Sequence, residues 1–396
     1  MPANQPASLV LPISCTIFFR LVLNTARRFA YPFAPALSRG LNVPLSSITS
    51  LIAVNQITAV LGACIGPLSD RLGYRRMMVT GLALLGIGML AAAMLPIYHM
   101  VVVALFLAGL GKSIYDPALQ AWVSMRVPYQ RRAAVIGILE ISWAASTLIG
   151  IPLIAVLMNR YGWRSPFLVM GVLGCVGSLV IYWVTPKVTI SQPAETKGLR
   201  YFNGFGRLAA SKPALGVLGY AFFVSAANDN LFVVYGAWLE SSFGFGILAL
   251  GLGTSIIGVA ELTGEALTAA ASDRIGLKRG VIIGLGLSTC SYLMLPFLNH
   301  SMPLAMGGLA ALFLFFEFMM VTSFSLSTEL LPLNRATMMA GFFAAAGIGR
   351  VVGALSGGIV WQAGGIVATA LVSGGLSILG LICLLIGLSG WRHGGA

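Results

Sequence analysis

Many ionisable side chains of this sequence lie inside long apolar segments, where a charge is costly. Such residues usually face a cavity or one another, where they bind polar solutes, carry protons or form ion pairs. Six of the eleven acidic residues are placed in this way. The embedded ionisable residues are Arg20, Arg27, Arg28, Lys112, Asp116, Glu140, Asp229, Glu261, Glu265, Glu317 and Arg350.

Spacing groups several of these residues on shared helix faces. Residues three or four positions apart lie on the same side of a helix. We therefore expect each group to point one way, either into a polar cavity or toward a charge on a neighbouring helix. The groups are Arg20 with Asn24, Arg27 and Tyr31, Lys112 with Asp116, and Glu261 with Glu265.

Glu317 is the residue best placed to carry a proton. It follows the apolar run 313–316, and no basic residue is close to it in the sequence. Burial raises the pKa of a carboxyl group where no cation offsets it, and a proton carrier needs a pKa near ambient pH. We predict that at least one embedded carboxylate carries a coupled proton. The candidates are Glu317, Glu140, Asp116 and Asp229, followed by Glu261 and Glu265.

One charged turn occurs twice. The sequence GPLSDRLGYRR at 66–76 returns as ASDRIGLKR at 271–279, and PYQR at 128–131 returns as PLNR at 332–335. Matches in register indicate an internal duplication. In each charged turn an aspartate lies beside arginines that can bind carboxylates or backbone carbonyls, so the turn could hold one end of the molecule closed. Its residues are Gly66, Asp70, Arg71, Gly73 and Arg76 in the first copy, and Asp273, Arg274, Gly276 and Arg279 in the second.

The composition is typical of a membrane protein. The 396 residues are 58% hydrophobic and 9% charged, whereas roughly a quarter of a soluble domain is charged. A helix needs about 20 apolar residues to cross a bilayer, so the chain has room for twelve crossings. The predicted helices are 10–35, 47–69, 77–97, 100–124, 133–157, 165–186, 213–238, 245–270, 280–298, 303–326, 337–361 and 366–390.

The net charge of +13 is distributed unevenly. If both termini lie inside, the outer connections hold only Arg39, Arg160 and Arg164, while most other basic residues occupy the inner ones. This asymmetry predicts cytoplasmic termini through the positive-inside rule. It also explains the excess of basic residues without requiring a nucleic-acid partner.

The duplication and the longest polar interval divide the chain near its middle. We predict an N-terminal six-helix bundle over 1–186, a cytoplasmic linker over 187–212 and a C-terminal six-helix bundle over 213–396. Duplicated halves are common in secondary transporters, whose substrate site lies near the membrane midplane between them.

The doubled serine-aspartate-arginine turn and Gly162-Trp163-Arg164 before the sixth helix resemble the major facilitator superfamily over the whole chain. Within it, the sequence is most similar to the twelve-helix bacterial drug and sugar proton antiporters. The resemblance implies two pseudo-symmetric bundles and a gating role for the charged turns. It also implies that the first, fourth, seventh and tenth helices line a cavity. The candidate lining residues are then Arg20, Asn24, Arg27, Lys112, Asp116, Asn228, Asp229, Asn230 and Glu317.

Structural ion pairing is the alternative for every embedded charge. We consider Lys112 with Asp116, and Arg350 with Glu261 or Glu265, as pairs that never meet solute. Arg28 is turned about 100° from Arg27 and is expected to pair or to extend toward the membrane surface. In the fifth helix, Pro152 near Gly150 is expected to bend the span.

The sequence favours a secondary transporter in a bacterial inner membrane that exports a small organic solute in exchange for protons or another coupling ion. The alternatives are proton-coupled uptake of an organic anion, suggested by Arg20, Arg27, Lys112 and Arg350, and translocation of lipid. No ATP-binding motif, cofactor motif, metal-ligand set or catalytic constellation is recognisable. We expect no enzyme activity, and we expect a monomer in contact with membrane lipid.

Overall fold

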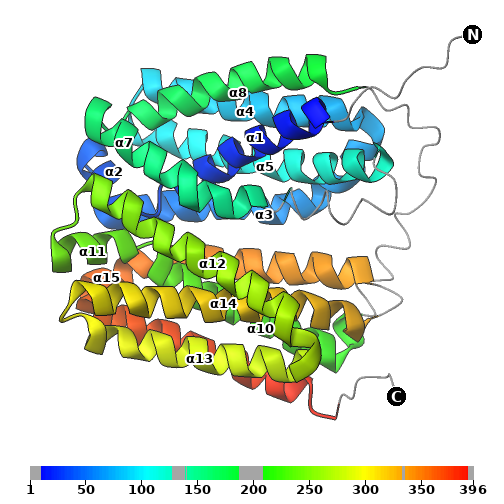
Figure 1. Ribbon diagram of the computed structural model, residues 1–396, viewed down its shortest axis with the longest axis vertical. Coiled ribbons are helices and arrows are strands. Elements are labelled where there is room, and N and C mark those ends of the chain that lie inside the picture. The colour runs from blue at the N-terminus through cyan, green and yellow to red at the C-terminus, as the bar shows by residue number, and fades with distance from the viewer. Residues whose placement is uncertain (1–9, 127–138, 140, 187–207, 332–334, 391–396) are drawn as a thin grey trace, which may run out of the picture.

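The computed structural model describes residues 10–126, 139, 141–186, 208–331 and 335–390, and every regular element in these ranges is helical. Figure 1 shows the helices in two groups. One group contains α1 (Val10–Arg28), α2 (Ala34–Leu41), α3 (Leu45–Leu72), α4 (Tyr74–Met94), α5 (Tyr98–Arg126), the π-helical turn η1 (Ser146–Gly150), α7 (Ile151–Tyr161) and α8 (Ser165–Val184). The other contains α10 (Lys212–Phe232), α11 (Tyr235–Phe243), α12 (Ile247–Ile275), α13 (Leu277–Leu298), α14 (Met302–Leu330) and α15 (Arg335–Gly387).

The expected all-α membrane fold with twelve spans is confirmed. Ten helices of the described chain are long and apolar enough to cross a membrane. One of them, Thr337–Gly387, consists of two helices that meet at a kink at Gly364 and Gly365. The 28-residue α3 supplies the remaining span.

The two groups lie side by side, and the described ends of the chain, the start of α1 and the end of α15, lie on the same side of the molecule (Figure 1). We call the groups the N-terminal and C-terminal bundles. We call the side with the chain ends the terminal side, and the opposite side, where α2 and α11 lie, the far side. The predicted linker falls mostly on residues 187–207, outside the described residues, so the proposed domain boundaries stay a prediction.

The first helix of each bundle is interrupted, whereas the sequence predicted one continuous helix in each place. Residues 29–33 form turns between α1 and α2, and residues 233–234 separate α10 from α11. Pro32 lies in the first break, where its missing N–H and fixed φ disfavour a continuing helix. The two breaks occupy corresponding positions, which agrees with the duplication.

The charged turns have the same backbone in both copies. Gly73, after α3, has φ +90°, and Gly276, after α12, has φ +87°. Only glycine adopts this conformation without strain, so these two residues explain why each helix ends there.

The two bundles contact each other along α3 with α15 and along α7 with α12. On the far side they approach to backbone contact, because a Cβ placed on Gly236 of α11 would lie 2.3 Å from the carbonyl oxygen of Pro32. Arg39 of α2 also forms an ion pair with Glu240 of α11. The far side is therefore closed.

The predicted bend in the fifth helix takes the form of a π-helical turn. Ser146–Gly150 is π-helical and leads directly into α7, where Pro152 lacks an N–H to donate. Gly150 allows α1 to pack against this turn, since a Cβ there would lie 2.1 Å from Oγ1 of Thr25.

Candidate functional site

A cavity of about 410 Å³ lies between the two bundles. We call it the main cavity. From the N-terminal bundle α1, α3 and α5 contribute to its walls, and from the C-terminal bundle α14 and α15. Its lining residues include Arg27, Lys112, Asp116, Gln120, Met320, Phe324, Phe343 and Arg350.

The main cavity opens on the terminal side. Its lining residues on α5 and α14 belong to the halves of these helices that point to the terminal side in Figure 1. Gln120 is exposed, and Phe343 is 52% exposed. Because the far side is closed, the structure shows a cavity accessible from one side only.

A second cavity of about 60 Å³ lies deeper in the molecule, and we call it the inner cavity. Arg27 and Arg350 line both cavities, so they separate one from the other. The inner cavity is also lined by Arg28, Tyr31, Gln56, Trp143, Asn228, Asp229, Glu261 and Glu317.

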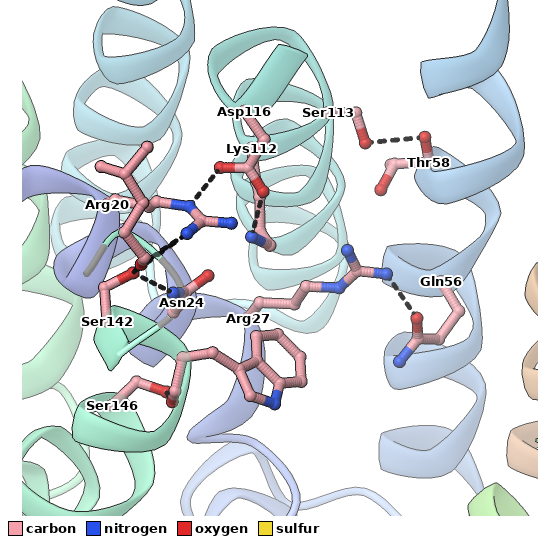
Figure 2. A network of polar contacts seen from close by, with 12 residues as sticks. Arg20, Asn24, Arg27, Gln56, Thr58, Lys112, Ser113, Asp116, Ser142 and Ser146 are labelled. Atoms are coloured by element: carbon pink, nitrogen blue, oxygen red, sulfur yellow. Dashed lines mark hydrogen bonds and ion pairs between the residues drawn. The ribbon is translucent and has the colours of Figure 1, made fainter. Parts of the chain in front are cut away.

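Two cations of the N-terminal bundle share one carboxylate. Arg20 lies 3.1 Å from Asp116 through Nε, and Lys112 forms the expected ion pair with the other oxygen of Asp116. Arg20 Nη1 also donates to the carbonyl oxygen of Leu139 at 2.6 Å. Figure 2 shows this network joining α1 to α5. Asp116 is thus largely neutralised within its own bundle.

Three predicted lining residues, Arg20, Asn24 and Asn230, line neither cavity. Asn24 is buried and donates to Ser142 Oγ at 3.3 Å. Asn230 is buried and donates to Ser373 Oγ at 3.0 Å, on α15. Like Arg20, which is 5% exposed, they lie against helices of their own bundle.

Arg27 has different surroundings from Arg20. It donates to Oε1 of Gln56 at 2.6 Å (Figure 2). Among the described residues, no carboxylate lies within the 4.0 Å of an ion pair with Arg27. Its guanidinium therefore lies at the boundary of the two cavities without a described carboxylate in direct contact.

Asp229 connects the two bundles. Its Oδ1 accepts a hydrogen bond from the hydroxyl of Tyr31 at 2.9 Å, and its Oδ2 lies 3.9 Å from Nε of Arg350. Tyr31 in turn accepts a hydrogen bond from Nε2 of Gln56. The side chains of Tyr31, Gln56 and Asp229 are all buried.

A second buried contact joins the bundles beside the inner cavity. Arg28 forms an ion pair with Glu261 at 2.6 Å, and both side chains are 6% exposed. Arg28 also lies over the ring of Trp143, 4.4 Å from its centroid. The expectation that Arg28 would pair is confirmed. Of the two partners expected for Arg350, Glu261 pairs with Arg28 instead, and the pairing with Glu265 stays a prediction. Arg350 lies within ion-pair distance of Asp229.

The inner cavity is lined by polar side chains, and some of their atoms have no hydrogen-bond partner in the described part of the protein. Nη1 of Arg28, Oε2 of Glu261 and Oδ1 of Asn228 are buried without a partner among the described residues. Glu317 lines the same cavity. Buried polar atoms in a space of this size are typically bridged by water.

The structure describes the residues of the two charged turns only in part. Arg76, Arg274 and Arg279 are exposed on the terminal side. Their neighbours Arg75 and Lys278 bind the carbonyl oxygens of Tyr182 and Leu388, near the ends of the sixth helix of each bundle. Glu140 and the side chains of Asp70, Arg71 and Asp273 lie outside the described residues, as do the surroundings of Gly66.

Gln56 and Trp143 are residues of the site that the sequence did not predict, and Tyr31 was expected on the polar face of the first helix but not as a lining residue. Gln56 is a long amide within the apolar span 47–69, and Tyr31 continues the face of Arg20, Asn24 and Arg27. Both signals are present in the sequence, but an uncharged polar residue in a membrane helix is too common to identify a site alone. Within the described residues no cluster has metal-ligand composition.

The electrostatic character of the main cavity follows from these contacts. Three cations, Arg27, Lys112 and Arg350, and one carboxylate, Asp116, line it. Lys112 and Asp116 offset each other, and Arg350 is only loosely paired. The cavity is thus suited to a solute with negative charge.

Comparisons with known proteins agree with this architecture. The chain is 25% identical over 355 residues to YceJ, an uncharacterized MFS-type transporter of Bacillus subtilis (strain 168), covering 87% of this chain and 88% of the relative. It is 22% identical to the sialic acid transporter NanX of Escherichia coli (strain K12), covering 57% of this chain and 55% of the relative. The crystal structure of a bacterial homolog to the human lysosomal transporter Spinster superposes with a TM-score of 0.80 at 13% identity, covering 98% and 96% of the two chains.

The sequence model of one family matches nearly the whole chain. The match covers residues 16–226 and again 217–392, which together include both bundles and both cavities. The family is one of multi-pass membrane transporters, and this chain belongs to it: the Major Facilitator Superfamily.

Proposed function

We propose that this transporter carries small organic anions, coupled to protons, with the main cavity as the solute site. The observation that carries the proposal is the excess of cations in that cavity, above all Arg27, which has no carboxylate partner within 4.0 Å among the described residues. The sequence favoured export, with uptake of an organic anion as the alternative. The arrangement of charges supports the alternative.

Arg27 and Arg350 extend from opposite bundles toward the same space. Arg27 belongs to α1 and Arg350 to α15, and both line the main cavity. A carboxylate between two guanidinium groups forms strong, charge-assisted hydrogen bonds with each. An anion bound there would draw the bundles together on the terminal side, which is the movement that alternating access requires.

The opposite wall suits an apolar portion of the solute. Met320, Phe324 and Phe343 line the main cavity. Pockets for small molecules usually have volumes of about 300–1,000 Å³ and combine apolar walls with a few polar groups. The cavity therefore fits an organic acid with a carboxylate at one end and an apolar or aromatic body.

Similarity to a sialic acid transporter supports the same class of solute, because sialic acid is a carboxylic acid. At 22% identity this similarity supports the charge of the solute and not its structure.

The coupling proton has candidate sites next to the anion site. An anion that binds Arg350 competes with Asp229 for the same guanidinium, and a carboxylate that loses its cation binds a proton more readily. Glu317 lies in the inner cavity, and no described cation is within ion-pair distance of it. Uptake of the anion together with a proton follows, since each favours the binding of the other.

We also propose that the protein lies in the inner membrane of a bacterium with both termini in the cytoplasm. The charge asymmetry of the connections supports this orientation. Arg39, Arg160 and Arg164 are the basic residues expected outside, and Arg39 lies on the far side with α2.

A thermal-shift screen tests the proposed solute class. Purified protein is heated with sialic acid, benzoate and 4-hydroxybenzoate, with benzamide as a neutral match for benzoate, and with organic cations. A ligand that binds the folded form raises Tm by mass action. We expect a carboxylate to raise Tm and its neutral match to have no effect. Stabilisation by neutral or cationic compounds alone would contradict the proposal.

A further inference from the structure

Four side chains form a single hydrogen-bonded chain from the solute site to the other bundle. Arg27 Nη2 donates to Gln56 Oε1 at 2.6 Å, Gln56 Nε2 donates to the hydroxyl of Tyr31, and Tyr31 donates to Asp229 Oδ1 at 2.9 Å. The first three residues belong to the N-terminal bundle and Asp229 to α10 of the C-terminal bundle.

All donors in this chain point the same way. Arg27 has only donors, so Gln56 must turn its oxygen toward Arg27 and its NH₂ group toward Tyr31. The Tyr31 hydroxyl then accepts from Gln56 and gives its own proton to Asp229. The chain ends on a carboxylate, whose oxygens only accept when it is ionised. Each member thus fixes the orientation of the next.

Burial makes it costly to break any hydrogen bond in this series of side chains. Gln56 is 4% exposed, Tyr31 is 2% exposed and Asp229 is 3% exposed. An unmet hydrogen bond in such surroundings costs the desolvation of the group. Tyr31 also packs against Phe232 of the opposite bundle, with ring centroids 4.5 Å apart. The chain therefore persists only while Tyr31 and α10 stay in contact.

The link between Tyr31 and Asp229 lies at the interrupted first helices of both bundles. Tyr31 belongs to the break between α1 and α2, and Asp229 lies one turn before the break between α10 and α11. The far side can open only if α2 and α11 separate, and that movement pulls Tyr31 from Asp229.

We propose that Gln56 and Tyr31 are positioning residues that hold Arg27 in the solute site while the far side is closed, and that the Tyr31–Asp229 hydrogen bond is one of the contacts that keep it closed. The cation of the site is then fully ordered only in the conformation that opens on the terminal side. The role assigned to Arg27 rests on the proposed function; the effect of Gln56 and Tyr31 on closure does not.

The distance between two spin labels, measured in the absence of solute, tests the proposal. Spin labels are placed at Tyr161→Cys and Ser242→Cys, two exposed far-side positions on opposite bundles, after the five native cysteines have been replaced. The parent is compared with Tyr31→Phe and Gln56→Met, which remove hydrogen bonds with little change in size. Tyr98→Phe is the matched control, because its hydroxyl donates to Ser47 within the N-terminal bundle.

We expect Tyr31→Phe, which removes the buried hydrogen bond between the bundles, to increase the ratio of long-distance to short-distance populations about fivefold. Gln56→Met removes the two hydrogen bonds that orient Tyr31 and Arg27, so we expect a smaller increase in the same direction. Tyr98→Phe should leave the distribution of the parent unchanged. The proposal is overturned if either site variant superimposes on the parent, or if Tyr98→Phe shifts the populations equally. Each variant is first checked by size-exclusion chromatography, where it should elute like the parent. If Gln56→Met does not fold, the result for Tyr31→Phe alone decides the proposal. A solute screen without anion binding would contradict the proposed function and leave this result standing.

Discussion

Arg27 differs from the other embedded cations in having an amide, and no carboxylate, as its described hydrogen-bond partner. Arg20 and Lys112 share Asp116, and Arg28 pairs with Glu261. Spacing along one helix placed Arg20 and Arg27 on the same face, but it could not show which would meet a carboxylate. That difference depends on residues about 100 positions or more away, and no local pattern reveals it.

Replacing Arg27 with glutamine tests its role as the cation of the solute site. A charge-assisted hydrogen bond contributes about 1.5–3 kcal/mol, so we expect the affinity for carboxylates to fall about 10- to 100-fold. The measurement is binding of the carboxylate that raises Tm in the screen. Arg164→Gln, at an exposed position before α8, is the control and should bind like the parent. Equal affinity in Arg27→Gln would remove Arg27 from the site.

Replacing Glu317 with glutamine tests proton coupling. The amide cannot exchange a proton, so we expect accumulation driven by an imposed pH gradient to be lost in vesicles, whereas exchange of solute for solute continues. Asp229→Asn is the second variant, because Asp229 competes with solute for Arg350. Glu329→Gln, on the same helix α14 but near the terminal side, is the matched control. Gradient-driven accumulation that is unchanged in both site variants would exclude these two residues as proton carriers.

Replacing Arg20 with methionine should affect stability more than solute binding. Arg20 is 5% exposed and bonds to Asp116 and the carbonyl oxygen of Leu139. Losing charge-assisted hydrogen bonds costs about 2 kcal/mol each, so we expect Tm to fall by several degrees. Carboxylate affinity measured well below Tm should stay within about twofold of the parent. A large loss of affinity at unchanged Tm would instead place Arg20 in the solute site.

At the scale of helices, the sequence predicted positions well and interruptions poorly. The helices expected at 165–186 and 280–298 are Ser165–Val184 and Leu277–Leu298, because continuous apolar runs with polar ends define a span. The breaks at 29–33 and 233–234 and the π-helical turn at Ser146–Gly150 lie inside apolar runs. Packing between the bundles stabilises these interruptions, and a hydropathy pattern contains no information about such packing.

The close approach of the two bundles on the far side depends on a glycine of α11. A Cβ on Gly236 would lie 2.3 Å from the carbonyl oxygen of Pro32 on the opposite bundle, so alanine prevents this close approach. We expect Gly236→Ala to favour molecules that are open on the far side, with a larger long-distance population in the spin-label measurement. Gly246→Ala is the control, because a Cβ placed there would meet no neighbouring atom within 4 Å. An unchanged distance distribution in Gly236→Ala would show that the far side closes without this contact.

At the scale of the whole molecule, the duplication in the sequence corresponds to two helical bundles around a cavity that reaches only the terminal side. The doubled charged turns predicted the repeat, and the matching glycines Gly73 and Gly276 confirm that both copies end a helix in the same way. The charge of the cavity could not be predicted. Arg27, Arg350 and Asp229 come from three helices in two bundles, and their net effect emerges only when the bundles are assembled.

The central claim is that an organic anion and a proton cross the membrane together through this cavity. The most direct measurement is acidification of the lumen of proteoliposomes that contain a pH-sensitive dye, after sialic acid, benzoate or 4-hydroxybenzoate is added outside at matched pH. Protein-free liposomes correct for passive entry of the acids. We expect solute-dependent acidification for at least one carboxylate with the parent protein and none with Arg350→Gln. No protein-dependent acidification with any of these acids, or equal acidification with Arg350→Gln, would contradict it.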